Sequence, residues 1–475
     1  MQRADGIDAA FLAAETPQWH FHVSALQILD PTDAPDFGFS TFYRLCEQRL
    51  HLVAQFRWKL IGPPFRLGWS WFVDDPDFDL ANHLHHVVLP APGATHELDA
   101  MIGDLLGRKI DRTRPLWEMW FIEGLAGGRV AVLTKVHHSI IDGQSGAEVA
   151  TLLFDLTPEP PVETEPERYE PETTPSWLEI VGRNTLQVAS MPVGVARFGR
   201  QIVEQGVASV PYLRGKKVPA MPFQAPSTPF NGQLTPHRSF AAAALPLDAV
   251  HALKTEVGVK LNDVVLAVCA GVLRSYLHDN HQLPDRALIA QVPISLRTAD
   301  NAARNRKGVV GTKVGSMFVS LATDIADPVE RLHAIHDSSV AAKQMQGTLA
   351  EHGSLGFSDV LLPSVFSAAA RTWSVGHLDG RTPPIFNLII SNVAGPPMDF
   401  YVAGARVEHM YPLGPLLYGG GLNITVFSNG GTIDIGLISC PELVADPRTI
   451  AERFVPVFDE LVAAVKKRRR RKVEP

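Results

Sequence analysis

A strand followed by two histidines, a turn and a helix is the segment that most restricts how this chain folds. Residues 130–136 (VAVLTKV) are rich in β-branched residues and roughly alternate, which is typical of a buried strand. His137 and His138 follow directly, Asp142-Gly143 predicts a turn, and residues 144–154 have the pattern of a helix. Two imidazoles therefore lie where a strand ends in an α/β arrangement, a place where side chains can face a cleft.

The chemistry available at this strand end is proton transfer. Histidine titrates near neutral pH, so an imidazole there can take a proton from an alcohol and pass it on. A histidine pair alone is weak evidence, but the spacing HHxxxDG between a strand and a helix is far more specific. The second pair, His85-His86, lies in a strand-like run without a following Asp-Gly, and we assign it no function.

Several further motifs occur in a fixed order along the chain. They are Pro115-Leu116-Trp117, Asn262-Asp263 at the start of an apolar helix-like stretch, PISLR from Pro293, NLIISNVAGPP from Asn387 and GGGLNITV from Gly419. In this order the chain resembles the bacterial wax ester synthase/diacylglycerol acyltransferase family, which is part of the superfamily of CoA-dependent acyltransferases and peptide-synthetase condensation domains. The resemblance extends from Gly6 to about Val465.

The resemblance implies an α/β fold with two chloramphenicol-acetyltransferase-like subdomains that face each other across a substrate tunnel. The alternation of strand-like and helix-like runs is compatible with this fold, although periodicity alone gives only two α/β domains. We therefore expect an N-terminal acyltransferase half over 1–155 and a C-terminal half over 237–465. A Pro/Glu-rich linker with an amphipathic helical segment would occupy 156–236, and a basic tail 466–475.

The resemblance also implies roles for the motif residues. His138 would be the general base that takes the proton from the acceptor hydroxyl during attack on the acyl thioester, which contributes roughly 10²–10⁴ in rate. His137 should face away and support the loop, because adjacent residues on extended backbone point to opposite faces. Asp142 would anchor the loop by pairing with an arginine, and Arg57 and Arg297 are both candidates.

Asn262 is the predicted oxyanion donor, with Asp263 as its structural neighbour. This role is carried over from the Asn-Asp motif of the family, and the loss of such a donor typically costs about 10²–10³ in rate. An asparagine at the start of a helix can also be the helix N-cap. The sequence leaves both roles of Asn262 open.

Two groups of residues are predicted to contact substrate. The Pro-Leu-Trp motif would shape the mouth of the channel, and the glycine-rich motif would let a ligand approach the backbone closely, since glycine has no side chain. No helix with Lys-Ser/Thr follows these glycines, so they do not form a phosphate loop. The candidate substrate-binding residues are Pro115, Leu116, Trp117, Gly420, Gly421 and Asn423.

The sequence predicts direct acyl transfer within a ternary complex. It contains no GxSxG nucleophile elbow, and Cys46, Cys269 and Cys440 are far apart and are expected to be reduced, mostly buried thiols. We therefore predict that long-chain acyl-CoA and diacylglycerol form triacylglycerol. The thioester is already activated, so no metal or redox cofactor is expected.

Two alternative functions remain at this point. The acceptor could be a fatty alcohol, giving a wax ester synthase, and relatives often carry an aromatic residue where this chain has Asn429. A non-catalytic, condensation-like lipid-binding protein is the other alternative, against which the intact HHxxxDG and Asn-Asp motifs speak.

Charge and hydropathy limit the partners and the location. A formal net charge of -7 gives no reason to expect nucleic acid. Arg3, Asp5 and Asp8 interrupt any N-terminal apolar run, and no segment reaches the apolar length of a membrane span. We expect a cytoplasmic protein, with peripheral contact to a membrane or lipid-droplet surface as an additional possibility.

Two segments could make such a surface contact. Residues 177–210 predict two helical pieces with an amphipathic face, which could pack on the protein or lie on a membrane. The run KKRRRRK at 466–472 is a like-charge block that we expect to be a disordered, solvated tail. A weak attraction to anionic lipid headgroups is its alternative, at about 1 kcal/mol per basic residue.

Overall fold

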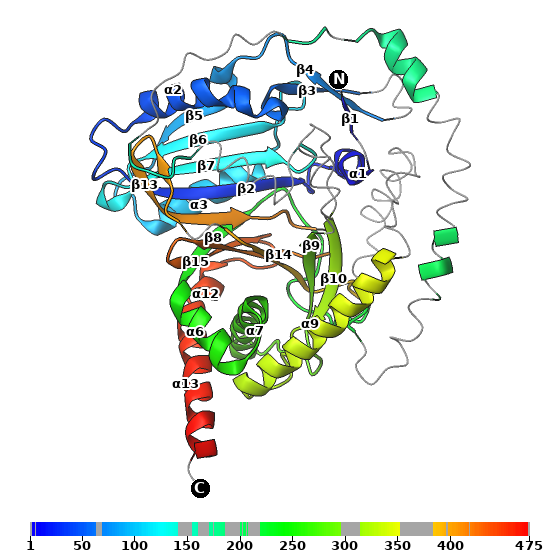
Figure 1. Cartoon of the computed structure of the whole chain (residues 1–475), viewed down its shortest axis with the longest axis vertical. Helices are drawn as coiled ribbons and strands as arrows, with labels where there is room; N and C mark the ends of the chain where they lie inside the picture. Colours follow the sequence, from blue (N-terminus) through cyan, green and yellow to red (C-terminus); the bar gives the residue numbers. More distant parts are fainter. Residues whose placement is uncertain are drawn as a thin grey trace.

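Two six-stranded mixed sheets, each covered by helices, make up most of the computed structural model of the chain (Figure 1). A third, three-stranded sheet in the order β1-β4-β3 (Gln2–Arg3, Trp71–Asp74, Trp58–Ile61) flanks the first. The structure describes residues 2–4, 6–62, 69–140, 154–159, 171–173, 175–185, 219–295, 314–351, 383–395, 398–417 and 419–473, together with short pieces between 200 and 207.

The N-terminal sheet carries the strand with the two histidines at its centre. Its order is β12 (Tyr401–Val402), β13 (Ala405–Leu413), β2 (His22–Asp30), β7 (Val130–His137), β6 (Trp117–Glu123) and β5 (Leu84–Val88). β7 pairs antiparallel with both neighbours, and His22 lies opposite His137.

Helices α2 (Phe39–Arg49) and α3 (Thr95–Gly107) cover opposite faces of this sheet. The alternation of β7 explains how both faces are filled. Val132 and Val136 pack on the α2 side, whereas Ala131 and Leu133 pack on the α3 side.

The C-terminal sheet contains the parallel strands that end at the predicted site. Its order is β10 (Val314–Ser320), β9 (Ile289–Ser295), β11 (Leu388–Val393), β14 (Leu422–Asn429), β15 (Thr432–Ser439) and β8 (Ser239–Pro246). β9, β11 and β14 are mutually parallel neighbours, so their carboxyl ends meet at one edge.

Helices cover the second sheet (Figure 1). They are α6 (Leu247–Val257), α7 (Leu261–Asp279), α9 (Pro328–Glu351) and α13 (Phe454–Val473). α7 is buried without a break from Asp263 to Leu273, because the sheet and its neighbouring helices enclose it. A short helix, α12 (Arg448–Ala451), precedes α13.

The two halves share a strand. β13 lies between β11 and β14 in sequence, yet it pairs with β2 of the N-terminal sheet from Ser24 to Asp30. It passes close over the C-terminal sheet, where a Cβ at Gly436 would lie 2.2 Å from the carbonyl oxygen of Pro412. Only glycine permits this approach, so the crossing of β13 over β15 depends on Gly436.

The structure confirms the α/β fold with two sheet-based halves, and it confirms the strand predicted over 130–136. The predicted helix over 144–154 falls almost entirely outside the described residues. The prediction of a disordered basic tail is wrong, because α13 continues as a helix to Val473 and extends beyond the body of the molecule (Figure 1). Its buried residues Phe454 and Phe458 anchor the helix, and cations near a helix C-terminus interact favourably with the exposed carbonyl groups.

The amphipathic segment after residue 176 packs on the body where it is described. Residues 177–185 are helical, Ile180 is buried, and Asn184 Oδ1 accepts a hydrogen bond from the Trp69 backbone N–H at 3.0 Å. Trp177 and Leu178 remain 64% exposed at the start of this helix. In the described part of the chain, no helix combines the length and apolar character needed to cross a membrane.

Candidate active site

His138 lies at the end of β7 against two phenylalanines. Its backbone N–H donates to the carbonyl oxygen of Phe21 at 2.7 Å, which fixes the chain at the strand end. The residue is half-buried, and its ring lies 4.8 Å, centroid to centroid, from Phe11 of helix α1 (Gly6–Ala14). Phe11 in turn stacks on Phe21 at 4.7 Å. The position of the His138 ring therefore depends on α1 and on the residue just before β2.

His137 contacts a different set of residues, as expected for neighbours on extended backbone. Its side chain is 1% exposed, and its Nδ1 accepts a hydrogen bond from the Ser139 backbone N–H at 3.1 Å. The neutral ring therefore carries its proton on Nε2, which lies 3.9 Å from Oε2 of Glu15. Burial lowers the pKa of His137 well below its usual value, so the ring is neutral at neutral pH.

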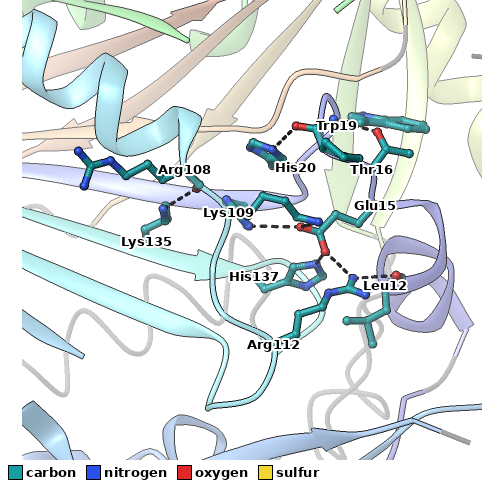
Figure 2. A network of polar contacts seen from close by, with 12 residues as sticks. Leu12, Glu15, Thr16, Trp19, His20, Arg108, Lys109, Arg112, Lys135 and His137 are labelled. Carbon is teal, nitrogen blue, oxygen red and sulfur yellow. Dashed lines mark hydrogen bonds and ion pairs between the residues drawn. The ribbon is translucent and has the colours of Figure 1, made fainter. Parts of the chain in front are cut away.

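A buried carboxylate lies beside His137, as Figure 2 shows. The Glu15 side chain is 1% exposed, and its oxygens lie 2.5 Å from Arg112 Nη2 and 3.3 Å from Lys109 Nζ. Arg112 Nη2 also donates to the backbone carbonyl of Leu12 at 2.7 Å. This Glu15 network therefore connects the end of α1, the loop before β6 and the end of β7.

Two more histidines adjoin this network and are neutral as well. The His22 ring lies 5.3 Å from that of His20 and 5.9 Å from that of His137. Burial lowers the pKa of His20 to about 4 and that of His22 well below its usual value. The charge of Glu15 is therefore balanced by Arg112 and Lys109, and the nearby imidazoles contribute no positive charge.

The sequence reasoning did not find Glu15, Lys109 or Arg112. A glutamate directly after the apolar stretch of α1 was the only signal, and nothing in the sequence pairs it with cations about a hundred residues later. The pairing results from the tertiary fold.

The Pro-Leu-Trp motif is part of the hydrophobic core. Leu116 and Trp117 are fully buried, and the Trp117 indole N–H donates to the Phe56 carbonyl oxygen at 2.7 Å. The Leu116 carbonyl accepts the backbone N–H of His137 at 2.9 Å. The motif thus supports the end of β7, and substrate contact by Pro115, Leu116 or Trp117 stays a prediction.

Asn262 lies in the first turn of α7, but another residue caps this helix end. Oδ2 of Asp263 accepts the backbone N–H of Lys260 at 3.1 Å and a hydrogen bond from Nδ1 of His336 at 2.7 Å. Lys260 holds the N-cap position. Asn262 is therefore not the helix N-cap, and its Oδ1 accepts a hydrogen bond from Nδ2 of Asn392 at 3.4 Å.

The glycine-rich motif packs against the chain itself. A Cβ at Gly421 would lie 2.4 Å from Cδ1 of Leu443, and one at Gly420 would lie 2.8 Å from the Phe386 ring. Asn423 is buried and donates from Nδ2 to the Pro415 carbonyl at 2.9 Å. The described contacts of these residues are internal, and a ligand contact at Gly420, Gly421 or Asn423 stays a prediction.

The predicted anchor of the motif loop cannot be placed. Asp142 and Arg297 lie outside the described residues, and the Arg57 guanidinium lies over the Phe78 ring, 5.9 Å from its centroid. The pairing of Asp142 with either arginine stays a prediction.

The three cysteines are buried free thiols, as predicted. Burial raises the pKa of Cys46 and of Cys269 to about 12, so neither forms the reactive thiolate at neutral pH. Within the described residues, no group of three or more His, Cys, Asp or Glu side chains has the arrangement of a metal site.

Comparisons with known families show which proteins the chain is similar to. Residues 5–265 match the model of the wax ester synthase/diacylglycerol acyltransferase catalytic domain, and residues 310–462 match the C-terminal domain of the same family. A Mycobacterium tuberculosis protein named as a candidate diacylglycerol O-acyltransferase is 36% identical over 97% of this chain and 90% of its own length. A second protein from that organism with the same type of name is 37% identical, over 97% of this chain and 99% of the relative.

Solved structures give the same result. The wax ester synthase/diacylglycerol acyltransferase of Marinobacter aquaeolei VT8 superposes with a TM-score of 0.69 at 28% identity, over 97% of this chain and 98% of that one. A trichothecene 15-O-acetyltransferase from Fusarium sporotrichioides has a TM-score of 0.59 at 13% identity, covering 98% of this chain and 94% of its own. The first condensation domain of a calcium-dependent antibiotic synthetase has a TM-score of 0.56 at 14% identity, covering 97% of this chain and 96% of its own. The last two show a shared fold.

Proposed function

Because the chain belongs to the wax ester synthase/diacylglycerol acyltransferase family, we propose that it transfers the acyl group of long-chain acyl-CoA to diacylglycerol and so forms triacylglycerol. The observation that carries this proposal is the HHxxxDG motif at the end of β7, in a chain that matches both domains of the family. The reaction needs a base for the acceptor hydroxyl, and His138 is the half-buried histidine of that motif, whereas His137 is buried.

In the proposed reaction, the acceptor hydroxyl attacks the carbonyl carbon of the thioester while the His138 imidazole takes the hydroxyl proton. The C–S bond then breaks, and the imidazolium returns the proton to the CoA thiolate. The ester and free CoA are the products, so the base is regenerated in each turnover. The contact with Phe11 supports this role, because an aromatic neighbour limits the hydration of the ring and restricts its orientation.

Asn262 and Asp142 complete the proposed machinery. Asn262 would donate its side-chain N–H to the oxyanion of the tetrahedral intermediate, and Asp142 would hold the loop after His138 by pairing with an arginine. His137 would support the same loop through its bonds to Ser139. Burial raises the pKa of all three cysteine thiols, so each stays protonated at neutral pH. This favours direct transfer over an acyl-enzyme. The kinetics should therefore be sequential.

Two acceptors are candidates for this reaction. The Marinobacter match is named both as a wax ester synthase and as a diacylglycerol acyltransferase, so a fatty alcohol is the second candidate acceptor. Both acceptors are lipids, and we propose that the protein reaches them through peripheral contact with a membrane or lipid-droplet surface. The exposed Trp177 and Leu178 and the basic end of α13 are the surface elements that support such contact.

A single assay tests the proposed function. Purified protein receives long-chain acyl-CoA with diacylglycerol, monoacylglycerol or hexadecanol in parallel, and the lipid products and released CoA are quantified. We expect triacylglycerol as the main product. His138→Ala should lose about 10²–10⁴ in rate with an unchanged melting temperature and unchanged acyl-CoA binding.

Two outcomes of this assay would contradict the proposal. A His138→Ala protein that keeps more than about a tenth of the wild-type rate would exclude His138 as the base. If product formed only from hexadecanol, the acceptor would be a fatty alcohol and not diacylglycerol.

A further inference from the structure

The motif NLIISNVAGPP has no role in the reaction described so far, although its residue Asn392 contacts Asn262. Its residues 388–393 form β11, and Asn392 lies opposite Val426 of β14 in the parallel pairing. Asn392 is thus near the carboxyl end of β11, at the edge where β9 and β14 also end. Helix α7 begins at the same edge, because Asn392 contacts Asn262 in its first turn.

The contact between the two asparagines has a defined polarity. Nδ2 of Asn392 donates to Oδ1 of Asn262 at 3.4 Å. A carboxamide presents its acceptor on one side and its two N–H donors on the other. When Oδ1 of Asn262 faces β11, its N–H groups face away from β11 and are available to another acceptor.

The backbone that carries Asn262 is fixed independently by the next residue. Asp263 is 1% exposed, and its carboxylate binds the Lys260 backbone N–H and the His336 ring of α9. The first turn of α7 is therefore held in place on two sides. What remains free is the rotation of the Asn262 carboxamide itself, and Asn392 opposes that rotation.

The edge that holds Asn392 also packs against the half of the molecule that carries His138. Phe427 of β14 belongs to the hydrophobic cluster of the N-terminal half, and Val393, its neighbour on β11, packs against that cluster. The same cluster includes Ile140, two residues after His138. The carboxyl end of β11, which carries Asn392, thus packs against the half of the molecule that carries His138.

We propose that Asn392 is a positioning residue that orients the oxyanion donor. Its N–H group holds Oδ1 of Asn262, so the Asn262 N–H groups stay directed at the oxygen that becomes negative during acyl transfer. This inference rests on the proposed function, in which Asn262 stabilises that oxyanion. It assigns Asn392 no contact with substrate.

Two substitutions of Asn392 separate this role from simple packing. Asn392→Asp keeps the shape but has acceptors only, so it repels Oδ1 of Asn262 and attracts its N–H groups, which turns the donor away from the substrate. Asn392→Ala only frees the rotation. We expect Asn392→Asp to lose about 10–10² in kcat, approaching the loss of Asn262→Ala, and Asn392→Ala to lose less than about tenfold. A packing role predicts the opposite order, because aspartate fills the space of asparagine.

A double-mutant cycle provides the decisive measurement. In the Asn262→Ala background no donor remains to be turned, so Asn392→Asp should change kcat by less than about twofold. Asn280→Asp, an exposed site at the other end of α7, is the control for the added charge and should keep the wild-type rate. Melting temperatures of all variants report any loss of folding.

The possible failures can be told apart. Equal or milder loss for Asn392→Asp than for Asn392→Ala, or independent losses in the cycle, would overturn the positioning role of Asn392 alone. A normal rate for Asn262→Ala would instead overturn the oxyanion role in the proposed function, and the inference about Asn392 with it.

Discussion

The buried Glu15 and the partly exposed Arg112 form an ion pair, and the loss of stability should depend on which of the two partners is removed. Glu15→Gln removes the carboxylate and leaves Arg112 and Lys109 without their counter-ion. Arg112→Gln removes one cation and leaves the carboxylate with Lys109. Both changes remove the same 2.5 Å contact, so any difference reflects the environment of the charge that remains.

The exposed fractions of the Glu15, Lys109 and Arg112 side chains determine how much free energy of unfolding each variant should lose. Removing one partner of a buried pair costs about 3–5 kcal/mol when the remaining charge stays buried. Glu15 is 1% exposed, but Lys109 remains 3.3 Å away, so we expect Arg112→Gln to cost about 2–4 kcal/mol. After Glu15→Gln the remaining cations are 36% and 39% exposed. Water can solvate them, and we expect a cost of about 1–2 kcal/mol.

Melting temperatures from calorimetry at pH 7 test this order. The control is Arg108→Gln in the same loop, whose ion pair with Asp104 is 63% and 62% exposed and should contribute less than about 1 kcal/mol. The double variant Glu15→Gln/Arg112→Gln should melt above Arg112→Gln alone, since no buried carboxylate remains. A melting temperature for Glu15→Gln at or below that of Arg112→Gln would refute the reasoning.

Two further predictions concern His409 of the shared strand β13 and the basic C-terminal end of α13. Asp434, fully buried on β15, bonds to His409 of β13 and raises its pKa. Because the folded pKa is the higher one, this stabilisation is complete below about pH 6.5 and is lost as the pH rises through the folded pKa. The melting-temperature difference between wild type and His409→Gln should therefore shrink between pH 6 and pH 8.5, and a constant difference would argue against the ion pair. Replacing the exposed Lys466, Lys467, Arg470 and Arg471 by Gln removes four charges worth about 1 kcal/mol each near an anionic surface. Binding to vesicles with anionic lipid should weaken at least about tenfold while turnover of a detergent-dispersed acceptor is kept, and unchanged binding would exclude this helix end as a lipid contact.

The sequence predicted the elements of this fold better than it predicted their contacts. The strand over 130–136 and the apolar helix that begins near Asn262-Asp263 follow from periodicity and apolar content, which are local properties. The charge run at 466–472 was misjudged because its helix is set by residues upstream, such as Phe454 and Phe458, that bury one side of α13. A rule for like-charge blocks does not include that support.

In the candidate site, too, local motifs could be predicted from the sequence, but contacts between distant residues could not. The HHxxxDG and Asn-Asp motifs were identified because their residues are adjacent in sequence. Glu15 and Arg112, or Asn262 and Asn392, are about a hundred residues apart and meet only in the folded chain. No periodicity connects such pairs.

Strand β13 joins the two family domains into one structural unit. The match to the catalytic domain of the family ends at residue 265, yet β13, which comes much later in the chain, pairs with β2 of the N-terminal sheet. Val407 and Met410 of this strand belong to the same hydrophobic cluster as Trp117 and Ile140. Without β13, the edge of β2 and one side of this cluster would face water at the strand end that carries His138. The N-terminal sheet, whose strand β7 ends at the histidine motif, is therefore completed by a strand from the C-terminal domain.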